Sequence, residues 1–142
     1  MQNILIIKHG SLGDLIQANG AMEDIKKSNL TSHVVLLTSV PYFDLMNQCP
    51  YIDEVLVDKR EPRWNLFYLY KLKKKLSSFN FVRIFDLQNS SRTEFYRNHL
   101  LRKSEWSSTV TALEPGQKKS DFDKEPVLER MEIQLKKSRI KT

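Results

Sequence analysis

Short, unbroken runs of apolar residues recur along residues 1–101, and a stretch with helical periodicity separates each run from the next. A strand with helices on both faces needs such a run, because all of its side chains are buried. The runs predict four strands, at residues 4–7, 33–38, 54–57 and 81–86. Strands that alternate with helices form parallel, right-handed crossovers. The sequence therefore predicts the α/β class, with a Rossmann-like parallel sheet and helices on both of its faces.

The stretches between these strands predict helices over residues 12–25, 41–47, 64–76 and 91–101. Ser91 or Thr93 is the expected cap of the last of these helices. Regular periodicity then fades, and we expect a loop with one more short strand near residues 107–110. We divide the chain into a Rossmann-like domain over residues 1–115 and a segment over 116–142 that contains a loop and a C-terminal amphipathic helix.

The length of 142 residues is enough for one domain with a single core. Cys49 is the only cysteine, so the sequence offers no disulfide framework and no cluster of cysteine metal ligands. We also find no signal-peptide pattern and no apolar run near the roughly 20 residues that span a bilayer. These features favour a cytoplasmic protein.

The net charge of +6 is concentrated in one stretch, because residues 59–75 carry seven basic side chains and one acidic one. Such a stretch favours an anionic partner, either a phosphate-bearing saccharide, a membrane surface or a nucleic acid. Aromatic residues and lysines interleave over residues 64–76, as in helices that lie at a membrane interface. A helix that packs on the sheet with a solvated basic face is the more common alternative. No nucleic-acid-binding module occurs in the sequence, so we expect no nucleic-acid partner.

The loop after the first expected strand, residues 10–14, contains two glycines and ends in Asp14. It lacks the glycine spacing of a dinucleotide fingerprint and the Gly-Lys-Ser/Thr of a P-loop. Asp14 stands at a helix start, where N–H groups and the helix dipole stabilise its ionised form, so it could accept a proton from a substrate hydroxyl. The alternative is that Asp14 only caps the helix. Lys8 and Ser11 could hold an anionic group, or Lys8 could simply be solvated.

A second polar loop, residues 86–92, follows the fourth expected strand. Gln88, Asn89 and Arg92 suit sugar hydroxyls and a phosphate or carboxylate, although a helix cap within a polar loop explains the same residues. His9 is a minor candidate beside the first loop, since its side chain could point to either face of the sheet.

Three ordered motifs are similar to those of the heptosyltransferase family of GT-B glycosyltransferases. The first is the initial strand with the Ser-Leu-Gly-Asp of residues 11–14. The second is Pro-Tyr-Ile-Asp-Glu-Val at residues 50–55, and the third is Asp-Leu-Gln-Asn-Ser at residues 86–90. The resemblance covers residues 1 to about 102. Gly10 stands where the family commonly has a second serine.

The resemblance implies an acceptor-binding N-terminal lobe of a GT-B fold, with Asp14 as the general base of an inverting transfer from ADP-heptose without a metal ion. By the same analogy, the acceptor is a saccharide of the lipopolysaccharide core, at the inner face of the cytoplasmic membrane. The residues expected to contact the acceptor or the sugar of the donor lie in the two loops: Lys8, Ser11, Gly13, Gln88, Asn89 and Arg92.

The resemblance also implies a second, donor-binding lobe, to which residues 116–142 would lead and which these 142 residues do not contain. We therefore expect little activity without a donor lobe from elsewhere. The alternative is a non-catalytic Rossmann-like module that binds a glycolipid or a membrane surface. A standalone nucleotide-binding protein is disfavoured, because neither phosphate-binding fingerprint is present.

Overall fold

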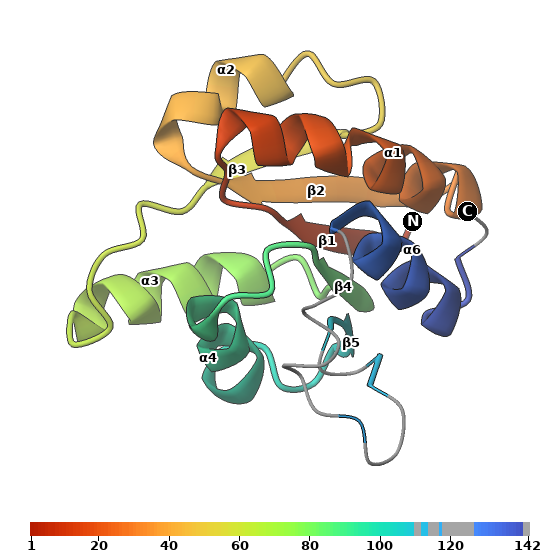
Figure 1. The fold of residues 1–142 in the computed structure, drawn as a ribbon. Helices are drawn as coiled ribbons and strands as arrows, with labels where there is room; N and C mark the ends of the chain where they lie inside the picture. The colour runs from red at the N-terminus through yellow and green to blue at the C-terminus, as the bar shows by residue number, and fades with distance from the viewer. Residues whose placement is uncertain (110–111, 114–116, 118–126, 141–142) are drawn as a thin grey trace.

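The computed structural model describes residues 1–109, 112–113, 117 and 127–140 of the chain (Figure 1). Five parallel strands form one sheet in the order β3-β2-β1-β4-β5. The strands are β1 (Asn3–Ile7), β2 (His33–Thr38), β3 (Glu54–Val57), β4 (Arg83–Asp86) and β5 (Glu105–Ser107). The helices are α1 (Leu12–Ser28), the 3-10 helix η1 (Val40–Tyr42), α2 (Phe43–Met46), α3 (Leu66–Ser77), α4 (Ser91–His99) and α6 (Val127–Lys137).

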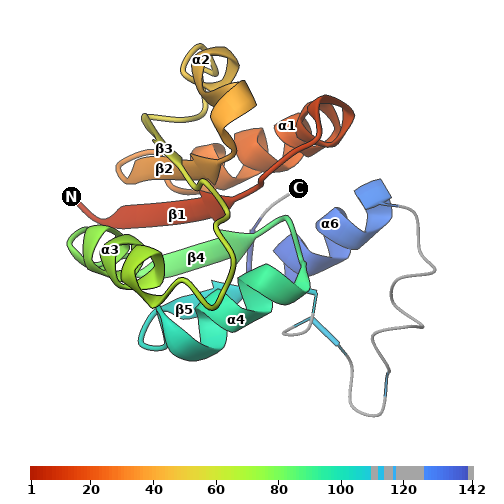
Figure 2. The same cartoon turned by 90° about the vertical axis from the view of Figure 1, so that its left-hand side faces the viewer.

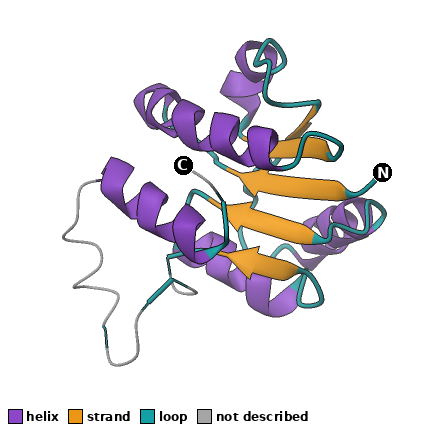
Figure 3. Cartoon of the chain, turned by 90° about the vertical axis from the view of Figure 1, so that its right-hand side faces the viewer, coloured by secondary structure: helices purple, strands orange, loops and turns teal. Residues whose placement is uncertain are grey.

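Strand β1 is the centre of the sheet and pairs in parallel with both β2 and β4. In this register Leu5 lies opposite Val35 on one side and Ile84 on the other. Figure 3 shows helices on both faces of the sheet. The predicted fold class is therefore confirmed, since crossovers between parallel strands carry the chain over one face or the other.

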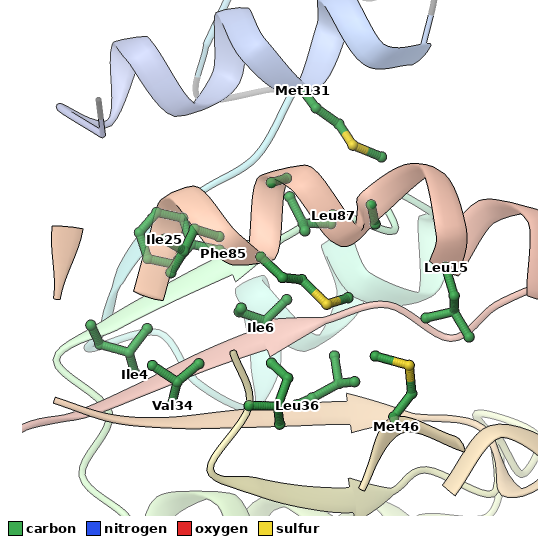
Figure 4. Close-up of a cluster of buried hydrophobic side chains, with 14 of the residues drawn as sticks. Ile4, Ile6, Leu15, Ile25, Val34, Leu36, Met46, Phe85, Leu87 and Met131 are labelled. Carbon is green, nitrogen blue, oxygen red and sulfur yellow. The ribbon is translucent and has the colours of Figure 1, made fainter. Parts of the chain in front are cut away.

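The side chains of β1 alternate between two hydrophobic clusters, one on each face. Ile4 and Ile6 pack in the cluster under α1, together with Phe85 (Figure 4). Leu5 and Ile7 pack in the opposite cluster, under α3 and α4. All four side chains are at most 1% exposed, which explains why this strand is a continuous apolar run in the sequence.

The C-terminal helix α6 lies against α1 on the first of these faces (Figure 1). Its Met131 and Leu135 belong to the same cluster as Ile4 and Ile6, and Ile140 follows them there. The amphipathic helix expected at the end of the chain is thus part of the core of this domain.

Several element boundaries differ from the predicted ones. Helix α3 begins at Leu66 rather than at residue 64, because the side chain of Asn65 accepts a hydrogen bond from Tyr68 N at 3.2 Å and caps the helix. The cap of α4 is Ser90, not Ser91 or Thr93; Thr93 N donates to its hydroxyl at 3.2 Å. The short strand expected near residues 107–110 lies earlier, at Glu105–Ser107, and much of the expected loop lies outside the described residues.

Candidate functional site

The two polar loops lie side by side, because they follow β1 and β4, which are neighbours in the sheet. Two hydrogen bonds join the residues that lead into the first loop to the second loop. Lys8 Nζ donates to the carbonyl oxygen of Leu87 at 3.1 Å, and His9 N donates to Gln88 Oε1 at 3.1 Å. Crevices at the carboxyl ends of parallel strands are the usual ligand sites of this architecture. The structure thus brings together the two loops that the sequence singled out.

The first loop turns at Gly10, where only glycine fits. Its φ of +126° is unfavourable for other residues, and an added Cβ would collide with the ring of Tyr42. Gly13 is different, because a Cβ there would meet nothing within 4 Å. The backbone around Gly13 therefore borders open space in the first turn of α1, where a ligand has room to approach.

Asp14 also lies in the first turn of α1 and is half-buried. Its Oδ2 accepts a hydrogen bond from Ser11 N at 3.1 Å and lies 3.4 Å from Ser11 Oγ. The capping role considered from the sequence is therefore present. Among the described residues, no donor to the other carboxylate oxygen, Oδ1, is found. The cap thus occupies one oxygen of Asp14 and leaves the second one available.

Lys8 is buried, only 6% exposed, so the alternative of a solvated lysine is wrong. Burial lowers the pKa of Lys8, and the nearby carboxylates of Asp14 and Asp86 act in the opposite direction. Its ammonium group therefore lies within the field of both carboxylates while it holds the backbone of the second loop.

The second loop is organised by Asp86, at the end of β4. Its Oδ1 accepts hydrogen bonds from Gln88 N at 3.1 Å and Asn89 N at 2.8 Å. Burial raises the pKa of the Asp86 carboxyl, although these N–H groups favour its ionised form. Asn89 has a left-handed backbone, with φ of +53°, and its side chain bonds Gln134 of α6 at 3.2 Å and Thr109 N at 2.8 Å.

Arg92 faces the interior of the protein rather than the first loop. Its Nε donates to the hydroxyl of Tyr96 at 2.6 Å, and Nη2 donates to the carbonyl oxygen of Glu61 at 2.6 Å. These bonds fasten α4 to the connector between β3 and α3, which can be followed in Figure 2. The binding role expected for Arg92 stays a prediction.

The structure reveals a polar cluster that the sequence analysis missed, centred on Asp58. This carboxylate is 1% exposed and follows the last residue of β3. His9 Nε2 lies 2.9 Å from its Oδ2, the hydroxyl of Tyr96 donates to the same oxygen at 2.6 Å, and the hydroxyl of Tyr68 donates to Oδ1. Arg60 N also donates to Oδ1, at 2.9 Å. The cluster ties the ends of β1 and β3 to α3 and α4.

The ionisation of this cluster follows from its contacts. Burial opposes the charged form of Asp58, but the hydrogen bonds from His9, Tyr68 and Tyr96 hold its pKa below the ordinary value. Burial and the neighbouring Asp58 raise the pKa of both tyrosine hydroxyls. His9 is 2% exposed, so this residue just before the first loop is enclosed in the protein, where it contacts Asp58. An aspartate directly after a buried strand was the only signal in the sequence.

One cavity lies beside Asp14, and a larger one lies far from it. An apolar groove of about 330 Å³ runs between α1 and α2, and its wall includes Leu15 and Ile16, which follow Asp14 in α1. A larger cavity of about 500 Å³ is formed by residues before β4 and β5, at the amino ends of the strands and so away from the two loops. The groove is therefore the cavity that lies next to Asp14 along α1, although no residue of the two loops lines it.

In the part of the chain that the structure describes, no three His, Cys, Asp or Glu side chains are placed to hold a metal ion together. No described helix combines the length and apolar character that crossing a membrane requires.

The sequence matches no protein-family model and no curated protein. Solved structures do match it. The glycosyl transferase family 9 protein from Veillonella parvula DSM 2008 aligns with 99% of this chain at 15% identity and a TM-score of 0.71. The E. coli heptosyltransferase WaaC with ADP also aligns with 99% of the chain, at 15% identity and a TM-score of 0.65. E. coli ADP-heptose lps heptosyltransferase II aligns with 69% of it, at 16% identity and a TM-score of 0.57.

The chain spans less than half the length of each of these proteins: 42%, 48% and 28% in the same order. At such low identity the likeness concerns the fold. The 142 residues have the fold of the N-terminal half of these glycosyltransferases, a Rossmann-like parallel sheet with its loops at one edge.

Proposed function

We propose that this chain forms the acceptor-binding part of an inverting glycosyltransferase, with Asp14 as the general base. The observation that carries the proposal is the position of the Asp14 carboxylate. It lies at the start of α1, beside the carboxyl edge of the sheet, with Oδ2 held by Ser11 and Oδ1 available. A carboxylate that is oriented by one oxygen can use the other to accept a proton.

In the proposed reaction, an acceptor hydroxyl transfers its proton to Asp14 while its oxygen attacks the anomeric carbon of a nucleotide-activated sugar. A new C–O bond forms as the bond to the nucleoside diphosphate breaks, and the diphosphate leaves with the bonding electrons. Attack from the side opposite the leaving group inverts the configuration at the anomeric carbon. Asp14 supplies the proton acceptor for this step.

The acceptor would lie over the two joined loops. Ser11 and Gly13 border open space at the start of α1. In the neighbouring loop, Gln88 would offer the amide nitrogen that its bond to His9 leaves over, and a contact from Asn89 would have to replace the bonds of its amide to Gln134 and Thr109. Lys8 would add positive charge beneath the loops for a phosphate or carboxylate on the saccharide. Arg92 could contribute only if its guanidinium group left Tyr96 and Glu61. We propose a lipopolysaccharide-core saccharide as acceptor and ADP-heptose as donor, which agrees with the names of the enzymes that share the fold. The single cysteine fits a cytoplasmic reaction.

We also propose that most of the donor site belongs to a second lobe, in the same polypeptide or in another one. The matched enzymes are more than twice as long as this chain, and the proposed chemistry needs a nucleotide-sugar site. The 142 residues alone should therefore bind ADP-heptose very weakly. Isothermal titration calorimetry tests this expectation, and tight, stoichiometric binding would refute it.

The general-base proposal is tested by Asp14→Asn in the presence of a donor lobe that restores transfer. Asparagine keeps an oxygen that can accept the bond from Ser11 N, so the cap survives while the proton acceptor is lost. We expect the transfer rate to fall about 10²- to 10⁴-fold. Asp44→Asn is a matched control, because Asp44 is an exposed acid in the first turn of another helix. An unchanged rate in Asp14→Asn would show that another group takes the proton.

A further inference from the structure

The outer face of α3 and the turn just before it carry large apolar side chains that point into solvent. Trp64 is 81% exposed, Leu66 73%, Phe67 69% and Tyr70 63%. The opposite side of the same helix is buried against the sheet through Leu69, Leu72 and Leu76. The sheet-packing interpretation of this helix is therefore confirmed for its inner side, and it leaves Trp64, Leu66, Phe67 and Tyr70 unexplained. We call these four residues, with the lysines described next, the α3 outer face.

Four exposed lysines continue this face toward the end of the helix: Lys71, Lys73, Lys74 and Lys75. Lys71 Nζ lies 4.3 Å from the centre of the Phe67 ring, so the cationic and aromatic parts of the face are contiguous. Among the described residues, none of these lysines has a carboxylate within 4.0 Å. The positive charge of the face is thus not neutralised by ion pairs there.

The net charge of the chain, +6, comes from this region. Residues 59–75 hold seven of the 23 basic side chains and one of the 17 acidic ones, so the rest of the chain carries 16 of each. A surface that combines exposed aromatic residues with uncompensated lysines matches an anionic bilayer, where aromatic rings settle among the headgroups and lysines meet the negative lipids. A protein partner would account for the aromatic residues, which are enriched in protein interfaces, but not for the four lysines, because lysine is depleted there.

We propose that the α3 outer face binds the surface of an anionic lipid bilayer. This inference is independent of the proposed glycosyl transfer, since none of its residues belongs to the proposed active site. The geometry nevertheless connects the two. Tyr68, on the inner side of α3, donates to Asp58, which pairs with His9 next to Lys8. Arg63, just before α3, donates to Ser91 of α4 at 3.2 Å. A bilayer on this face would lie beside the edge that carries the two loops.

Co-sedimentation with lipid vesicles tests the apolar part of the face. The 142-residue chain should bind vesicles made of equal parts phosphatidylcholine and phosphatidylglycerol, and bind phosphatidylcholine vesicles far less. The double variant Trp64→Ser/Phe67→Ser should lose this binding. Leu30→Ser is the matched control, because Leu30 is 72% exposed in the turn after α1. Circular dichroism of each variant verifies that the fold is retained.

The lysines are tested by Lys71→Gln/Lys74→Gln, which should weaken binding about tenfold or more, since each basic side chain near an anionic surface contributes separately. Lys27→Gln/Lys136→Gln removes the same charge from helices α1 and α6 and should bind like the unmodified chain. Binding should also fall as the salt concentration rises.

Trp64 offers a direct readout. In a Trp106→Phe background it is the only tryptophan of the chain, and its emission should shift to shorter wavelength on anionic vesicles. The proposal is overturned if the chain ignores anionic vesicles, or if both double variants bind as well as the unmodified chain. It is equally overturned if sedimentation velocity shows a dimer that Trp64→Ser/Phe67→Ser disrupts and that vesicles do not displace. These outcomes do not depend on glycosyl transfer, so they separate the two proposals.

Discussion

Asp58 and Asp14 both lie near the carboxyl ends of the strands, yet the surroundings of the two carboxylates differ. Asp58 is 1% exposed. It accepts hydrogen bonds from the side chains of His9, Tyr68 and Tyr96 and from the backbone N–H group of Arg60. Asp14 is half-buried, and its partner is the neighbouring Ser11. Every strong acceptor position of Asp58 is thus used within the fold, whereas Asp14 keeps one oxygen for another molecule.

This difference separates a carboxylate that holds the site together from one that is free to react. A buried, multiply bonded charge fixes the elements around it and exchanges no proton with a substrate that cannot reach it. A carboxylate at an open helix start is oriented by its cap and remains accessible. Substitutions at the two positions should therefore affect different properties of the protein.

The largest expected effect is on stability, from Asp58→Ala. The change leaves the buried polar groups of His9 and Tyr96, and the half-buried hydroxyl of Tyr68, without their acceptor. Breaking a buried charge network of this kind costs about 3–5 kcal/mol of the free energy of unfolding. Urea denaturation followed by circular dichroism measures this loss, with the exposed Asp44→Ala as control. A loss below about 1 kcal/mol would mean that the Asp58 cluster contributes little to holding the ends of β1 and β3 against α3 and α4.

A smaller effect is expected on the pH dependence of stability, which should differ between the two buried carboxylates Asp58 and Asp86. The pKa of Asp58 lies below its ordinary value of 3.8 in the folded protein, so its stabilisation is complete above that pH and is lost as the pH falls further. The pKa of Asp86 is raised above 3.8, so its contribution has the opposite sign: the folded state gains relative stability as the pH falls through the raised pKa.

We therefore expect Asp58→Asn to flatten the loss of stability in acid and Asp86→Asn to steepen it. Urea midpoints measured from neutral pH down to about pH 3 compare the two variants with the unmodified chain. Equal slopes for all three proteins would contradict the opposite pKa shifts.

The smallest expected effect is that of Asp14→Asn on stability. Because the asparagine oxygen can still accept the bond from Ser11 N, the free energy of unfolding should change by less than about 0.5 kcal/mol. The same substitution is expected to have a large effect on transfer, and this contrast is the sharpest form of the comparison with Asp58. A stability loss near that of Asp58→Ala would assign Asp14 to the framework instead.

Much of the fold was predictable, because its signals are local. The strands at residues 33–38 and 54–57 were predicted with the boundaries that the structure has, since continuous apolar runs mark strands buried on both faces. The two loops of the candidate site were also predicted, because each follows such a run. The start of α3 was misplaced by two residues, since the cap at Asn65 competes with aromatic residues that suit a helix equally well.

The Asp58 cluster was not predictable in the same way. Its partners Tyr68, Tyr96 and His9 lie 10, 38 and 49 positions away in the sequence, and nothing local to any of them indicates the others. The exposed aromatic residues of α3 posed a related difficulty, because Leu69 and Phe67 are both apolar and only packing shows that one is buried and the other is not.

The sequence by itself determined the parallel sheet, the helices between its strands and the two polar loops at the strand ends, because each depends on the hydrophobic pattern of a short segment. The tertiary structure alone decided which polar and aromatic side chains are enclosed and which face solvent. Crossovers bring residues from distant segments to one edge of the sheet, and the burial of each side chain depends on what those segments place around it. For this reason Asp58 became part of the framework, while Asp14 and the outer face of α3 remained accessible.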